Sequence, residues 1–388
     1  MAIALALGIA PQALAQSLPP AVRFPFLANP LQDNPLDPLV PRPVVSRPLS
    51  PLELYTIEQA LDQLALEAEA LAEAGKLEEA RPVWRREIRL RRLLGIDREL
   101  AAIDRVGQWL RDSNATQDLQ LYAVRLDEIR AELALPSDRV LLEQMAVTYV
   151  VLGDIDAAAE IRRDLADAAQ LTDDAEYRRQ LEILAALRAD WFQFDEAAET
   201  YGELAARQED DPTDVRYLAL QAENLEQAQE FAGAIIRQQR LLTLYQGDES
   251  RWPQIAPLQH RVANNYLALD DLDTASRQFQ VAYTNAIDQG QLEVAATAVS
   301  DLAEIYKALG RWNDVGYLYE QLLLVERQAH NAYGMMTAYD QLGQLHEQLD
   351  TTPSALAAYR EGLVLARVLG TRQGYFETQI ARLTKGAS

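Results

Sequence analysis

The sequence predicts an all-α fold in which helical hairpins stack into a solenoid. Ala, Leu, Glu, Gln and Arg, which are good helix formers, dominate the 388 residues, whereas runs of β-branched residues are scarce. Apolar residues recur with a helical period from residue 52 onward. The outline of the segment YKALGRWNDVGYLYEQLL at 306–323 returns at 149–165 and 266–282, so the helical hairpin is a repeated unit.

The repeats align on the residue that opens the second helix of each hairpin. Successive anchors are separated by 39, 39, 39, 37, 41, 40 and 40 residues, a period typical of a helical solenoid. The anchors are Leu77, Thr116, Ile155, Phe194, Phe231, Leu272, Trp312 and Thr352. Ala or Gly stands nine residues before each anchor, and Ala stands three residues after it in six of eight repeats. Because small side chains let helices approach closely, we expect these positions to meet where the two helices cross.

Turn and capping residues agree with this alignment. We expect glycine to turn the chain between the two helices of a hairpin at Gly75, Gly153 and Gly310. We expect side-chain caps at the start of second helices from Asp156, Asp195, Asp273 and Asn313. The competing prediction is a long coiled coil, which the Ala, Glu, Leu and Arg content allows. The glycines argue against it, as do the alanines at positions where a coiled coil needs leucine.

The repeats resemble the tetratricopeptide repeat (TPR), a family of helix–turn–helix units with the motif L-G-x2-Y followed by A-x3-F. The segment VANNYLALDDLDTASRQF carries this motif at Val262, Ala263, Tyr266, Ala275 and Phe279. The segment LAEIYKALGRWNDVGYLYEQL carries it at Leu302, Ala303, Tyr306, Val315 and Tyr319. The resemblance covers residues 52–388 and implies a right-handed α-solenoid of about eight TPR-like hairpins. The period departs from the usual value of about 34 residues, and the proline that closes each unit is mostly missing.

The first 51 residues differ in composition from the rest. Residues 2–10 are apolar and are followed by the A-x-A pattern Ala13-Leu14-Ala15, so we expect a signal peptide at residues 1–15, although no basic residue precedes the apolar run. Residues 16–51 are proline-rich, with ten of the 17 prolines between Pro19 and Pro51. Proline favours polyproline geometry, so we expect an extended arm. Its apolar residues either pack onto the first helices or occupy a groove.

Composition and motifs exclude several classes of function. The net charge of −23 argues against nucleic acid as a partner, because phosphate binding needs a basic surface. The absence of cysteine excludes disulfides, thiol catalysis and Cys-based zinc sites. The three histidines lack the spacing of a helical metal site, and neither a glycine-rich phosphate loop nor a G-x-S-x-G motif occurs. We therefore expect a protein that is not an enzyme and has no cofactor or metal.

The TPR resemblance implies a binding groove, because the first helices of stacked hairpins line the concave face. The residues expected to point into this groove are Glu143, Val147, Val150, Glu182, Glu223, Glu226, His260, Asn264, Glu304, Lys307, Asp340 and Gln344. Val140, Val147 and Val151 share one face of a helix and form either an apolar floor for a peptide or ordinary packing. The Lys/Asn/Arg clamp with which some family members hold a partner's C-terminal carboxylate is not expected, because only Arg261 and Asn264 match it.

These observations predict a protein–protein interaction scaffold or assembly factor that holds an extended or helical segment of another protein. If the acidity serves recognition, that segment is basic. The alternative is a self-assembling structural repeat protein that stacks through an open terminal repeat, and an enzyme of unrecognised type is a third class. The predicted signal peptide places the protein in the periplasm. The composition also resembles that of some exported cyanobacterial repeat proteins, which adds the thylakoid lumen as a compartment.

Overall fold

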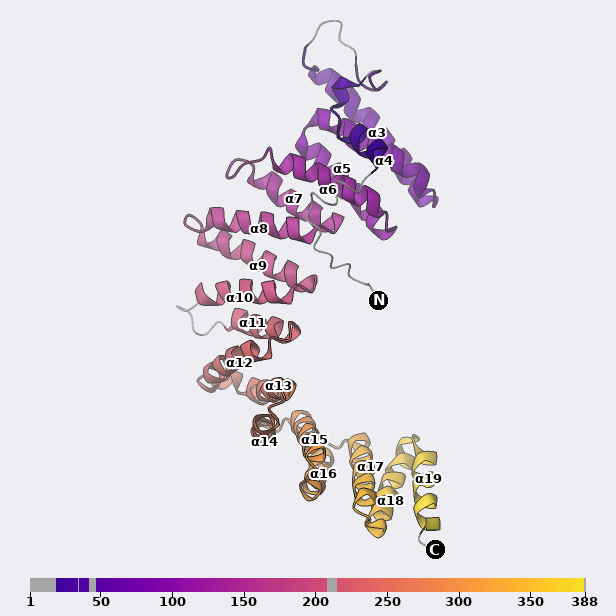
Figure 1. The fold of residues 1–388 in the computed structure, drawn as a ribbon, viewed down its shortest axis with the longest axis vertical. Helices are drawn as coiled ribbons and strands as arrows, with labels where there is room; N and C mark the ends of the chain where they lie inside the picture. Colours follow the sequence, from indigo (N-terminus) through magenta and orange to yellow (C-terminus); the bar gives the residue numbers. More distant parts are fainter. Residues whose placement is uncertain (1–18, 34, 42–46, 208–214, 387–388) are drawn as a thin grey trace. The chain divides into compact units, whose positions relative to one another are not determined.

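The computed structural model describes residues 19–33, 35–41, 47–207 and 215–386 (Figure 1). Across these residues the structure contains α-helices and short 3-10 helices and no β-strand, so the all-α prediction is confirmed. The chain divides into two compact units, residues 1–193 and 194–388, which are described separately. The signal peptide predicted at residues 1–15 lies outside the described residues. No helix in the described ranges is long and apolar enough to cross a membrane.

The first unit is a series of helices in which each packs against the next (Figure 1). Two short elements, α2 (Pro20–Leu27) and η1 (Pro30–Gln32), come before the repeats. The repeat helices are α3 (Pro51–Glu73), α4 (Leu77–Arg91), α5 (Ile96–Asp112), α6 (Thr116–Arg130), α7 (Arg139–Leu152), α8 (Ile155–Ala169) and α9 (Asp174–Asp190). A 3-10 turn, η2 (Arg92–Leu94), links α4 to α5.

The second unit continues the same pattern of helices packed in chain order (Figure 1). Its helices are α10 (Phe194–Arg207), α11 (Arg216–Gln227), α12 (Phe231–Gln246), α13 (Ile255–Ala268), α14 (Leu272–Asp288), α15 (Leu292–Ala308), α16 (Trp312–Gln328), α17 (Ala332–Gln348), α18 (Thr352–Leu369) and α19 (Gln373–Gly386). The 3-10 helix η3 (Glu249–Gln254) precedes α13. All eight anchors predicted from the sequence are the first residues of the even-numbered helices α4 to α18.

The turn inside each hairpin has the same backbone conformation in all eight repeats. The residue two positions before the second helix has a positive φ angle, between 54° and 83°, in every case. Three of these residues are the predicted glycines, and the other five are Asn114, Phe192, Gln229, Asp270 and Asp350. The left-handed conformation is costly for residues other than glycine, so the packing of the two helices enforces the turn where glycine is missing.

None of the four predicted N-caps, Asp156, Asp195, Asp273 and Asn313, is correct, because each is the second residue of its helix. In α8 and α14 the cap lies two residues earlier. Asp154 caps α8 by accepting a hydrogen bond from the Ala157 amide at 3.1 Å, and Asp271 caps α14 by accepting one from the Thr274 amide at 3.0 Å. Asp156 and Asp273 lie instead within the first turn of these helices. Their carboxylates there interact favourably with the positive end of the helix dipole. The left-handed turn residue is followed directly by the cap and then by the first residue of the helix. The cap therefore lies two residues before the predicted position.

The crossing positions lie in the core, as the sequence predicts. All eight small residues that stand nine positions before the anchors are buried, and Ala263 and Ala303 are fully so. The positions three residues after the anchors are also buried, except for Leu119 in the second repeat. Leu119 is the one residue among these eight that has a long side chain, since the other seven are Ala or Val. The hairpins therefore close on small side chains, and larger residues such as Trp84, Phe279 and Tyr359 fill the space beside them.

The proline-rich segment differs from the expected extended arm. Residues Pro20–Leu27 form the two-turn helix α2, which packs against α4. Proline is tolerated at the start of a helix because its missing amide would have no partner there, and Pro20 is the first residue of α2. Phe26 is buried in the hydrophobic core of the first unit, whereas Phe24 is exposed. Val44, another apolar residue of this segment, lies outside the described residues.

The last helix, α19, covers the eighth hairpin. Its Phe376 is fully buried, and the ring lies 6.3 Å from that of Tyr359 on α18. Ile380 and Leu383 are partly buried in the same cluster. The exposed face of α19 is polar and carries Gln373, Glu377, Thr378 and Thr384. Such a polar outer face is what the terminal element of a repeat array needs in water.

Candidate partner-binding surface

All twelve residues predicted to bind a partner lie on the first helices of hairpins, and their exposure divides them into two groups. Residues that directly follow the small crossing residue are exposed at Val147 in the first unit and at Glu223, Glu304 and Gln344 in the second, and the equivalent Asn264 is half-buried. We call the last four the first-helix row. The other predicted residues are partly or fully buried. Most of them contact a neighbouring first helix.

Glutamate–arginine pairs join consecutive first helices in both units, and we call these pairs the Glu–Arg ties. Glu143 on α7 accepts a hydrogen bond at 3.0 Å from Arg179 on α9. Glu226 on α11 accepts one at 3.1 Å from Arg261 on α13. The same arrangement occurs between α3 and α5 and between α17 and α19, through the pairs Glu69–Arg105 and Glu347–Arg382. Glu143 and Glu226, which were predicted to face a partner, therefore hold neighbouring repeats together.

The sequence contains a signal for these ties that the sequence analysis missed. In each tie the arginine stands 35 or 36 residues after the glutamate, slightly less than one repeat. This spacing brings the two side chains to adjacent turns of neighbouring first helices. Partly exposed ion pairs of this kind contribute about 0–1 kcal/mol each. Their main effect is therefore to fix the register of one first helix against the next.

A tie of different chemistry joins α13 to α15. The His260 Nε2 lies 2.7 Å from Oδ2 of Asp301, and its Nδ1 lies 3.2 Å from the Asn264 side-chain nitrogen. An amide nitrogen can only donate, so Nδ1 accepts from Asn264 and Nε2 carries the proton that is donated to Asp301. This arrangement orients Asn264 in the first-helix row. Arg261 beside it is held by Glu226.

Asp340 and Val150 are also engaged inside the fold. Asp340 is 5% exposed, and its carboxylate accepts hydrogen bonds from Arg372, which directly precedes α19, at 2.6 Å and from the hydroxyl of Tyr375 on α19 at 2.8 Å. Val150 packs against the core of the first unit. Val147 is 50% exposed and remains available, as does Val140. Of the three valines of the predicted apolar floor, Val140 and Val147 are thus exposed and Val151 is partly buried.

Glu304 and Lys307 on α15 form an exposed ion pair. The Lys307 Nζ donates to the Glu304 carboxylate at 2.9 Å, and the Glu304 side chain is 57% exposed. Hydrogen bonding to Glu304 favours the ammonium form, and the pKa of Lys307 is raised although partial burial opposes the shift. A basic partner would have to compete with Lys307 for Glu304, whereas Glu223 on α11 is exposed without such a contact on the described part of that helix.

A pH-dependent contact supports the junction of α7 and α9. Glu176 accepts hydrogen bonds from Arg179 at 2.8 Å and from Gln180 at 2.6 Å, and it pairs with Arg139 on α7 at 2.9 Å. The hydrogen bond from Arg179 is the main cause that lowers the pKa of Glu176 from 4.5 to about 2. A carboxyl group with a depressed pKa stabilises the fold above its unfolded pKa, and this stabilisation is lost as the pH falls through the folded value.

We therefore expect the free energy of unfolding of the wild type to fall between pH 4.5 and pH 2 by about 1–3 kcal/mol more than that of Glu176→Gln. Urea denaturation at a series of pH values measures this difference. Glu199→Gln, which removes an exposed carboxylate on α10, is the control and should follow the wild-type curve. Parallel curves for the wild type and Glu176→Gln would show that the carboxylate does not stabilise the α7–α9 junction.

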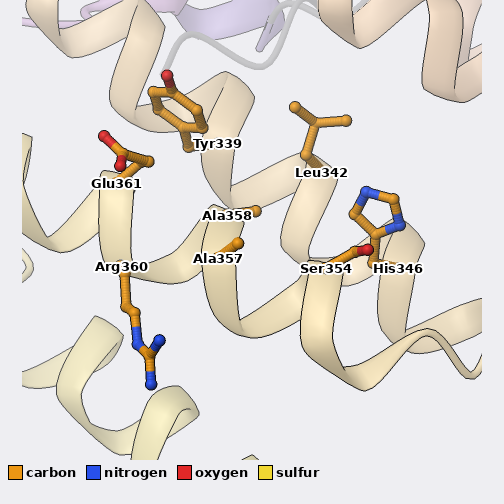
Figure 2. Close-up of a pocket in the computed structure, with 8 residues that line it drawn as sticks. All are labelled: Tyr339, Leu342, His346, Ser354, Ala357, Ala358, Arg360 and Glu361. Carbon is orange, nitrogen blue, oxygen red and sulfur yellow. The ribbon is translucent and has the colours of Figure 1, made fainter.

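A surface recess of about 500 Å³ lies on the eighth hairpin, between α17 and α18. Figure 2 shows Ala357 and Ala358 between Tyr339 and Glu361 at one end and His346 and Ser354 at the other. The seventh hairpin has bulkier residues at the corresponding positions 40 residues earlier, where Tyr306, Tyr317 and Leu318 replace His346, Ala357 and Ala358. The recess therefore comes from missing side-chain volume, a signal that the sequence analysis did not use.

No family model and no curated protein matches the sequence. Among solved structures the chain is similar to aspartyl phosphate phosphatase F from Bacillus subtilis, at 12% identity and a TM-score of 0.41, over 90% of this chain and 82% of that one. It is similar to the C-terminal part of a TPR repeat-containing protein from Cytophaga hutchinsonii, at 15% identity and a TM-score of 0.38, over 67% and 94%. It is also similar to BtubC from P. vanneervenii, at 14% identity and a TM-score of 0.39, over 56% and 92%.

Proposed function

We propose that this chain is a non-enzymatic scaffold that binds a segment of another protein along the first helices of its second unit. The observation that carries the proposal is the first-helix row. Glu223, Asn264, Glu304 and Gln344 occupy the same position on α11, α13, α15 and α17, at intervals of 41, 40 and 40 residues. A repeated surface position of this kind suits an extended or helical segment whose own side chains are evenly spaced.

The chemistry of the row supports a polar and partly basic partner segment. Glu223 and Glu304 provide exposed carboxylates, and Asn264 and Gln344 provide amides that can donate to or accept from a peptide. Neighbouring Glu226, His260 and Asp340 are held by contacts between helices, so they position the row and leave binding to its four members. Among the described residues no group of three or more potential ligands could hold a metal ion.

The polar outer face of α19 favours the scaffold function. It argues against the alternative, a structural protein that assembles by stacking on its eighth hairpin. Stacking of repeats buries apolar surface, and α19 offers mainly polar side chains there. An exported location remains part of the proposal and rests on the sequence of residues 1–15. The periplasm is the compartment proposed, or the thylakoid lumen if the source is a cyanobacterium. Fractionation of cells that produce the full chain tests this location.

To test this function, the full chain is first used to pull down partner proteins. The kinetics of their binding to the chain are then measured. We expect the double variant Glu223→Gln with Glu304→Gln to reduce the association rate about 2–10-fold at low salt, because exposed carboxylates steer a basic segment toward the row. The matched control is Glu199→Gln with Glu320→Gln, which removes two exposed carboxylates from second helices of the same unit.

The two double variants carry the same net charge, so only the position of the lost carboxylates differs. A partner that binds both variants equally well does not use the first-helix row. Rising salt should weaken wild-type binding because exposed charges are screened beyond about 8 Å at physiological ionic strength. An affinity that does not change with salt would remove the basic segment from the proposal.

A further inference from the structure

Arginines are concentrated on α4 and its C-terminal end, against the acidic character of the whole chain. Seven arginines lie between Arg81 and Arg98, although the net charge of the chain is −23. Arg86, Arg89 and Arg92 follow each other at intervals of three residues and bind the segment before the repeats, residues 19–41, which we call the arm. This surface is therefore suited to acidic groups.

The arm is held by its carboxylates and main-chain carbonyls. Arg89 donates two hydrogen bonds to Asp33, at 2.5 and 2.6 Å, and Arg86 donates two to Asp37, at 2.8 and 2.9 Å. Arg92 also donates to the Leu27 carbonyl at 3.2 Å, and Arg89 to the Ala28 carbonyl at 3.1 Å. Paired contacts between a guanidinium and a carboxylate are strong and specific in geometry.

Two buried apolar side chains, Phe26 and Val40, anchor the arm, and Phe26 is the aromatic one. Phe26 is 3% exposed and belongs to a core cluster with residues of α3 to α8, and its ring lies 5.5 Å from that of Tyr122 on α6. The guanidinium of Arg92 lies over the same ring at 4.8 Å. Val22 and Leu27 of α2 pack against the same cluster, and Val40 is 4% exposed in a second cluster with residues of α3 and α4, whereas Phe24 is 65% exposed. An eight-residue helix is not stable alone in water, so these few contacts determine whether the arm is docked.

The surface under the arm also retains hydrogen-bonding capacity that the arm does not use. The Arg92 Nη2 is buried and has no hydrogen-bond partner among the described residues. An unpaired buried donor costs free energy, so a ligand that supplied an acceptor to this group would bind better than the arm does. The arm therefore satisfies only part of the hydrogen-bonding capacity of the site.

We propose that the surface formed by α4, α5 and α6 is a binding site for an acidic peptide segment with an aromatic anchor. The arm occupies this site as an intramolecular ligand, and a partner protein displaces it with a segment of the same chemistry. The arm specifies that chemistry: an aromatic residue, followed by carboxylates seven and eleven residues later, as at Phe26, Asp33 and Asp37. This site is separate from the first-helix row and does not depend on the function proposed for that row.

The arm and the repeats belong to one chain, which sets the affinity that a partner segment needs. Because only residues 42–50 separate the arm from α3, the effective concentration of the arm at the site is high, so a free segment competes poorly with an intact arm. Weakening the arm's own contacts removes this competition while leaving every residue of the site in place. The variant Asp33→Asn with Asp37→Asn meets this condition, because both carboxylates belong to the arm.

The experiment uses the full chain and a labelled synthetic peptide with the sequence of residues 20–39. Fluorescence anisotropy should show the peptide binding at least about tenfold more tightly to Asp33→Asn/Asp37→Asn than to the wild type. The same peptide with Phe26→Ala should lose at least about tenfold in affinity for the variant, because the anchor is missing. Asp112→Asn/Asp167→Asn, which alters exposed aspartates elsewhere in the first unit, is the control and should bind the peptide as the wild type does.

Hydrogen exchange of residues 19–31 supplies an independent readout. The proposal expects faster exchange in Asp33→Asn/Asp37→Asn than in the wild type, while α5 and α7 stay protected. Unchanged exchange together with unchanged peptide affinity would show that the arm is a fixed part of the core, and the proposal would be wrong. Dimerisation of the variant over the concentration range of the binding assay would also overturn it, because the occupant would then be the arm of a second copy.

Discussion

Substitution of Ala263 by Phe should lower the melting temperature of the second unit by several degrees. Ala263 on α13 and Ala275 on α14 are both fully buried in one core cluster, at the two crossing positions of the sixth hairpin. A benzyl group there must push the two helices apart or force side chains out of their preferred rotamers. Overpacking of this kind costs about 1–3 kcal/mol or more. In a unit of this size each kcal/mol corresponds to about 2–4 °C.

The control is Ala268→Phe, which adds the same group to the same helix. Ala268 is the last residue of α13 and is exposed, so the added ring meets solvent. Its melting temperature, measured by circular dichroism, should stay within about 1–2 °C of the wild type. Equal melting temperatures for the two variants would contradict the assignment of Ala263 to the helix crossing.

Substitution of Gly343 by Ala should destabilise the eighth hairpin, although alanine is the better helix former. A Cβ atom at Gly343 would lie 2.5 Å from Cε1 and 2.6 Å from Cζ of Tyr359. Tyr359 is fully buried, and its hydroxyl donates to Glu347 at 2.6 Å, so the ring cannot move without losing this contact. We expect a net loss of about 1–3 kcal/mol, because the steric cost exceeds the gain in helix propensity of about 1 kcal/mol.

Gly374→Ala tests the same exchange where space is available. A Cβ atom at Gly374 on α19 meets no heavy atom within 4 Å, and the residue is exposed. Its substitution should stabilise the fold by a few tenths of a kcal/mol up to about 1 kcal/mol. Urea denaturation should therefore show shifts of opposite sign for the two variants. A stabilising effect of Gly343→Ala would mean that α17 and α18 do not pack as closely as the structure shows.

The repeat architecture was predictable from the sequence because its determinants are local and periodic. Small residues at the crossings and the anchors of the second helices recur about every 40 residues. An ambiguous assignment in one repeat is therefore resolved by its alignment with the others. The start of every second helix follows from this alignment. The caps were misplaced because Asp154 and Asp156 are equally good candidates by residue type, and only the turn geometry decides between them.

The candidate binding surface was less predictable because it depends on which polar side chains find partners within the chain. Glu143 and Glu223 look alike in sequence, yet one pairs with Arg179 and the other is exposed. The partners lie one repeat away, so their pairing depends on how adjacent hairpins stack. The docking of the arm was also outside what periodicity can reveal, since it depends on isolated contacts of Phe26 and Val40 and of two carboxylates.

The uniform turn at the centre of each hairpin bears on how an array of this kind can change in length. The same left-handed position accepts Gly, Asn, Asp, Gln and Phe, so no particular residue has to be preserved there when a segment of about 40 residues is duplicated. A copied module would bring its own crossing residues and would need only a compatible neighbour on each side. Evolution can therefore add or remove whole modules while each turn tolerates substitution, and the number of recognition positions would grow in step.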